Sequence, residues 1–87
     1  MKTLTITADI YAPKLGSIYR IYINDVLMTE RSAWWNVDQS YVEENMVIRV
    51  IEGSTVKIRL ETIGSDQLCE MKNITADGVP VEDTFIA

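Results

Sequence analysis

The stretch from Ser17 to Arg31 constrains the fold most, because it has the pattern of a β-hairpin. Two runs rich in β-branched and aromatic residues flank Asn24 and Asp25, residue types that tolerate a positive φ and suit a tight turn. A two-residue turn there predicts four cross-strand pairs: Ile23 with Val26, Tyr22 with Leu27, Ile21 with Met28 and Arg20 with Thr29. One further residue in the loop would pair Arg20 with Glu30 instead, so the sequence predicts the hairpin and leaves its register open.

A half-buried strand is predicted before this hairpin, over residues 3–11. Apolar side chains alternate there with threonine and aspartate, which places one face on a core and the other in water. The apolar set is Leu4, Ile6, Ala8 and Ile10. Pro13 and Gly16 then mark a turn into the hairpin.

Residues 41–51 and 55–63 predict a second hairpin, since both runs are apolar at alternate positions. Residues that face each other in an antiparallel pair share one side of the sheet, so the two apolar sets must be opposed. A three-residue loop, Glu52-Gly53-Ser54, achieves this and gives three pairs: Val50 with Val56, Ile48 with Ile58 and Met46 with Leu60. The same register sets Arg49 opposite Lys57 on the outer face, with Arg59 one step along.

A third hairpin is predicted from residues 68–76 and 79–86 around Asp77-Gly78, a strong two-residue turn signal. It pairs Ile74 with Val81 and Lys72 with Asp83. Because Pro80 cannot donate a ladder hydrogen bond, its strand is expected at a sheet edge or to be irregular.

About seven short strands with regular turn signals indicate an all-β fold in a single domain, residues 1–87. We expect a small antiparallel β-sandwich, immunoglobulin-like or jelly-roll-like, and an open barrel is the second choice. The stretch from Ser32 to Gln39 has no strand or helix period and is predicted to be a loop.

Enzymatic activity is not expected. The sequence has no histidine, which excludes Ser-His and Cys-His nucleophile pairs. Glu43 and Glu44 are neighbours in a predicted strand, so their carboxylates point to opposite faces and cannot share a site. The single cysteine, Cys69, rules out an internal disulfide and is expected to be a buried thiol. The acidic loops at Asp66 and Asp77 lack a calcium-loop spacing, and no cofactor is expected.

The charge of −5 lies entirely in residues 61–87, since residues 1–60 balance seven basic against seven acidic side chains. An acidic chain without a basic patch argues against a nucleic-acid binder. The first ten residues contain no continuous apolar run, which predicts that there is no signal peptide. No segment is long enough to span a membrane, so folding in a cytoplasm is expected.

Two side-chain groups are candidates for binding. Trp34, Trp35 and Tyr41 could close the end of the core, anchor a protein interface or stack on a sugar ring. The second group, Arg49, Lys57 and Arg59, could dock an acidic partner such as the C-terminal end of another copy. It could equally be a solvated face that Glu61 and Asn45 relieve.

The motif Y-R-I-Y-I-N-D-V-L-M-T-E-R, the two tryptophans, Y-V-E-E-N-M and G-S-T-V-K-I-R-L lie between Tyr19 and about Leu60. This pattern resembles short uncharacterised proteins encoded by tailed bacteriophages, which look like small β-sandwich virion components. The resemblance implies a head-decoration or other capsid-associated role. Its motifs are structural, so it assigns no individual functional residue.

Together these features lead us to expect a non-enzymatic structural protein of a phage particle, located in the virion. It would bind capsid or another virion protein as a decoration or cement module, in several copies or as a homo-oligomer. One alternative is a carbohydrate-binding module that uses the Trp34/Trp35 loop. Another is a small phage inhibitor of a host protein, with an acidic surface that mimics nucleic acid.

Overall fold

The computed structural model of the chain describes residues 1–13, 16–32, 41–64 and 66–87. These residues form eight strands. In chain order they are β1 (Lys2–Tyr11), β2 (Ile18–Ile23), β3 (Val26–Ser32), β4 (Val42–Val50), β5 (Thr55–Ile63), β6 (Glu70–Ala76), β7 (Val79–Pro80) and β8 (Thr84–Ile86).

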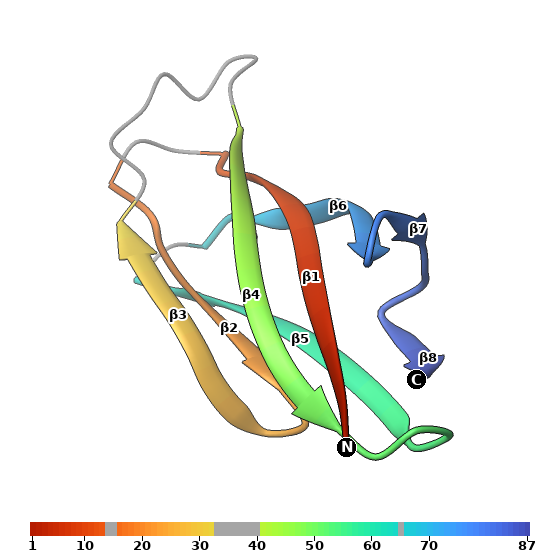
Figure 1. Cartoon of the computed structure of the whole chain (residues 1–87). Coiled ribbons are helices and arrows are strands. Elements are labelled where there is room, and N and C mark those ends of the chain that lie inside the picture. Colours follow the sequence, from red (N-terminus) through yellow and green to blue (C-terminus); the bar gives the residue numbers. More distant parts are fainter. Residues whose placement is uncertain (14–15, 33–40, 65) are drawn as a thin grey trace.

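The strands form two antiparallel sheets of four, with the orders β4-β1-β6-β7 and β3-β2-β5-β8 (Figure 1). The sheets pack face to face, and the predicted all-β, antiparallel β-sandwich is confirmed. Alternate side chains of β1, β2, β4 and β5 are buried, as expected where one face of each strand meets a core. The largest fully buried side chains are Tyr19, Ile6, Ile10, Ile21 and Val56.

The first hairpin is confirmed, with a two-residue turn in which Asn24 has φ 50° and Asp25 has φ 65°. The first two predicted pairs form at this turn, and the register then shifts by one residue at Met28. Beyond that bulge Arg20 faces Glu30, so each of the two candidate registers holds for part of the hairpin.

The prediction of a second hairpin was wrong, because β4 and β5 lie in different sheets. β4 pairs with β1, which places Ile48 opposite Leu4, and β5 pairs with β2, which places Ile58 opposite Ile23. Ile48 and Ile58 are both buried, so the inward faces were predicted correctly. The physical reason is that inward apolar sets also face each other across a sandwich. Alternation therefore fixes which side is buried and leaves the hydrogen-bonded partner undetermined.

The third hairpin is confirmed at its turn, where Asp77 has φ 50° and Gly78 has φ 81°. The amide of Val81 donates to the carbonyl of Ile74 at 3.0 Å, and β7, with Pro80, is an edge strand as expected.

The predicted pairing of Lys72 with Asp83 was wrong. Lys72 faces Asp9 on β1, and after β7 the chain leaves this sheet and crosses to the other one. There β8 pairs with the Thr55–Lys57 part of β5. Past Pro80 the Val81 amide still bonds to Ile74 on β6, and the chain then crosses to the other sheet, so the last predicted strand becomes two short ones.

A bulge in β6 was not predicted. Thr75 faces Thr7 and Lys72 faces Asp9, so Asn73 and Ile74 together oppose one residue of β1. Asn73 has φ 54°, and its side-chain amide donates to the Asp9 carboxylate at 2.9 Å. The extra residue reverses the alternation within the strand.

Candidate functional site

The aromatic group predicted as a binding site falls partly outside the described residues, because Trp34 and Trp35 lie in the segment 33–40. Tyr41, directly before β4, is 50% exposed. Its ring centroid lies 5.1 Å from that of Tyr11, at the end of β1, with the rings inclined by 36°. The Lys72 ammonium lies 4.9 Å from the centroid of the Tyr11 ring. Tyr41 is therefore one member of a partly exposed aromatic pair.

The predicted positive face does not exist as one surface. Arg49 lies on the outer face of β4, whereas Lys57 and Arg59 lie on the outer face of β5 in the other sheet. This separation follows from the corrected strand pairing. Asn45, expected to relieve these charges, lies on β4 and donates to Glu43 at 3.5 Å.

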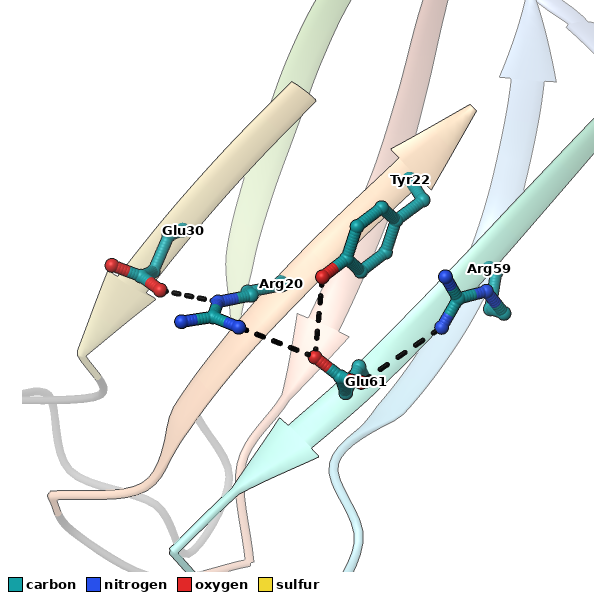
Figure 2. Close-up of polar contacts among 5 residues, drawn as sticks. All are labelled: Arg20, Tyr22, Glu30, Arg59 and Glu61. Carbon is teal, nitrogen blue, oxygen red and sulfur yellow. Dashed lines mark hydrogen bonds and ion pairs between the residues drawn. The ribbon is translucent and has the colours of Figure 1, made fainter. Parts of the chain in front are cut away.

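Arg59 belongs to a polar network on the outer face of the β3-β2-β5-β8 sheet (Figure 2). Its guanidinium lies 4.1 Å above the Tyr22 ring and 3.9 Å from the Glu61 carboxylate. Glu61 also accepts from the Tyr22 hydroxyl at 3.3 Å and lies 3.7 Å from Arg20. Arg20 pairs with Glu30, whose hydrogen bond raises the pKa of the Arg20 guanidinium. The expected neutralisation of positive charge by Glu61 is confirmed for Arg59. In this network the two guanidinium groups are matched by two carboxylates.

A polar cluster inside the sandwich was missed by the sequence analysis. Glu44 on β4 is only 5% exposed, and its carboxylate accepts from the Tyr19 hydroxyl on β2 at 2.6 Å. Arg31 on β3 donates to both oxygens of that carboxylate, each at 3.0 Å. One acidic side chain from one sheet is therefore held by two residues of the other.

The electrostatics of this cluster keep Glu44 ionised. Burial alone would raise the pKa of its carboxyl, but hydrogen bonds from Arg31 and Tyr19 and the Arg31 charge outweigh burial and lower it. Burial, followed by the hydrogen bond to Glu44, raises the pKa of the Tyr19 hydroxyl, and Arg31 is stabilised as a cation. At neutral pH none of the three groups changes protonation, so the cluster acts as a structural tie between the sheets.

The sequence did contain a signal for this cluster. Position 44 has the same parity as the apolar positions of its strand, Val42 and Met46, so its side chain had to point inward. Glu43 is exposed, which confirms that the two neighbouring carboxylates lie on opposite faces.

The outermost strands of the two sheets, β3 and β4, lie at the same side of the sandwich (Figure 1). A shallow groove of about 240 Å³ lies there, lined in part by Met28, Val47 and Arg49. Val26 and Val47, exposed apolar residues of these two strands, are part of its lining. We call this the β3–β4 side.

A larger groove of about 490 Å³ lies at the opposite side, between β5 and β6. Half-buried Leu60, Met71 and Ile74 line it together with the buried Cys69. Glu82 and Asp83, which connect β7 with β8, supply its acidic rim. We call this the β5–β6 groove.

Within the described ranges, no three His, Cys, Asp or Glu side chains gather in a way that could hold a metal ion. The same residues include no helix long and apolar enough to cross a membrane. Comparisons of the chain with protein-family models, curated proteins and solved structures found no match.

Proposed function

We propose that this chain is a non-enzymatic structural protein of a phage particle, a capsid decoration or other virion-associated module that acts through protein–protein contacts. The observation that carries the proposal is the β3–β4 side. There the outermost strands of the two sheets border one groove, and its lining includes the exposed side chains of Val26 and Val47. The resemblance of the segment from Tyr19 to about Leu60 to phage virion proteins supplies the biological context.

The chemistry of the β3–β4 side suits a protein partner. Edge strands offer unpaired backbone groups for strand pairing, and exposed apolar residues gain free energy when a partner covers them. Arg49 lines the groove on this side, and arginine and tyrosine are enriched among residues that dominate interfaces. Trp34 and Trp35, which fall between β3 and β4 in the sequence, stay candidate interface residues on the sequence alone.

Purified particles of the phage that encodes the chain provide the test, with its copies counted by quantitative mass spectrometry. We expect many copies per particle. Val26→Lys and Val47→Lys should each reduce binding to particles that lack the protein by about 30-fold, which corresponds to about 2 kcal/mol. Thr84→Lys is the matched control, since Thr84 is an exposed strand residue on β8, at the opposite edge of the sheet that contains β3.

Two outcomes would replace this proposal. Absence from particles, with early expression and a bound host protein, would favour the inhibitor. Binding on a glycan array that is lost on substitution of Trp34 or Trp35 would favour the carbohydrate-binding module.

A further inference from the structure

The β5–β6 groove exists because both sheets are only partly covered along this side. β8 pairs with β5 over Thr55–Lys57 alone, and β7 pairs with β6 only at Thr75 and Ala76. Among the described residues, no strand pairs with the outer edge of β5 over 59–63 or of β6 over 70–73. Two strand edges therefore border the same groove with backbone hydrogen-bonding groups that no strand in the described part of the chain uses.

The chain itself shows what kind of segment fits this side. Its C-terminal segment runs extended from one sheet to the other: the Val81 amide donates to Ile74 on β6, and Asp83 accepts from the Ile58 amide on β5 at 2.7 Å. Val81 and Phe85 pack against the core along the way. The C-terminal segment therefore covers the edge of β5 from Thr55 to Ile58. The groove begins beyond Ile58, where this segment no longer lies along β5.

The interior of the groove favours apolar side chains at alternate positions. Met71 and Ile74, three residues apart, both border it because the bulge at Asn73 reverses the alternation of β6. Leu60 borders it from β5, and these three side chains are only half-buried. Covering them would remove more apolar surface from water.

The acidic rim of the groove favours an occupant with a positive charge. Glu82 and Asp83 are exposed beside the groove, and the described part of the chain places no cationic group within ion-pair distance of either. Arg59, which also borders the groove, is engaged by Glu61 and Tyr22. A lysine or arginine on an occupant would meet two acidic side chains that have no cation.

We infer that the β5–β6 groove binds an extended segment of another protein. This segment adds a strand along the edge of β5 from Arg59 to Glu61, directs alternate apolar side chains onto Leu60, Met71 and Ile74, and sets a basic residue beside Glu82 and Asp83. The site lies opposite the β3–β4 side and does not depend on the virion role. A chain with both sites can bridge two proteins.

The test tethers a probe strand to the protein itself. Ala87 exchanges backbone hydrogen bonds with residues 53 and 54, so the chain ends near the start of β5. A Gly/Ser linker of about twelve residues has a mean span of roughly 20 Å, enough to bring the probe Lys-Val-Thr-Val-Thr-Val to the groove. Such tethering gives an effective concentration of the order of 1 mM. A control extension replaces the central valine and the threonine after it with proline, so that a ladder donor is lost in either register. A second control replaces lysine with glutamate.

We expect the valine-threonine extension to raise Tm by about 4 °C or more and to slow amide hydrogen exchange at Leu60, whose N–H points to the open edge of β5. The proline extension should match the parent in both measurements, and the glutamate extension should gain less than the lysine one. Equal Tm and equal exchange for the probe and its proline control would overturn the inference. Protection of the Leu60 amide that grows with the concentration of the unextended chain would assign the groove to a second copy, and would overturn the assignment to another protein.

Discussion

The Tyr19 hydroxyl on β2 donates a 2.6 Å hydrogen bond to the Glu44 carboxylate on β4, so a polar contact links the two sheets within the sandwich. Apolar packing is non-directional. In contrast, this bond and the two from Arg31 fix the position of the two carboxylate oxygens of Glu44. The cluster therefore aligns β4, an outermost strand, with β2 and β3 of the facing sheet. It also supports the strand that presents Val47 and Arg49 on the β3–β4 side.

Replacing Glu44 with alanine should lower the free energy of unfolding by about 2 kcal/mol or more. The variant removes a charged acceptor from Tyr19 and Arg31 and leaves a buried space. Urea unfolding at neutral pH measures the change. Glu43→Ala on the exposed face of the same strand is the control, and it should stay within about 0.5 kcal/mol of the parent. Equal losses in the two variants would show that the buried cluster adds no stability.

Acid should weaken the fold through the same carboxylate. The pKa of Glu44 is below its ordinary value of 4.5 in the folded protein, so the unfolded chain takes up the proton first as the pH falls. Its stabilising contribution is therefore complete above pH 4.5 and is lost as the pH drops through the folded pKa. Unfolding curves between pH 7 and pH 3 should fall less steeply for Glu44→Gln than for the parent. Parallel curves would contradict this assignment.

The sequence predicted buried faces well and strand partners poorly. Alternation placed Ile48 and Ile58 inward, and both are buried, but it could not distinguish a neighbour in the sheet from a residue across the sandwich. The turns at Asn24-Asp25 and Asp77-Gly78 were predicted because their residue types tolerate positive φ, a local property. Partner choice is a long-range property, and no short segment encodes it.

The candidate sites also differ in whether the local sequence could predict them. Burial of Glu44 could have been predicted from the parity of its strand, since the apolar residues two positions away on both sides point inward. The β5–β6 groove could not, because it depends on the bulge at Asn73 and on where the C-terminal segment turns away from β6. Both are long-range features: the bulge lies in the pairing of β6 with β1, and the segment leaves β6 before β8 pairs with β5. Trp34 and Trp35 remain predictions from the sequence.

The first turn offers a stabilising substitution. Asp25 holds φ 65°, a conformation that glycine adopts without steric cost, and the second position of such turns favours glycine. Asp25→Gly should raise the free energy of unfolding by up to about 1 kcal/mol. Asn24→Gly is the control and should give no gain, because the Asn24 side chain accepts a 2.9 Å hydrogen bond from the Lys57 amide. A larger gain at Asn24 than at Asp25 would show that this link to β5 is unimportant.

Cys69 should react slowly with a thiol reagent in the folded protein. Its side chain borders the β5–β6 groove but is only 6% exposed, and its amide donates to the Thr62 hydroxyl at 2.8 Å, which holds it against β5. If exposure requires an opening that costs about 3 kcal/mol, labelling should be about a hundredfold slower than in denaturant. The neighbouring Leu68 is 73% exposed, so Leu68→Cys in a Cys69→Ala background supplies an exposed thiol one position away. Its native labelling should approach the denatured rate. Equally fast native labelling at both positions would mean that the groove side opens readily, because only separation of β5 from the start of β6 uncovers the Cys69 thiol.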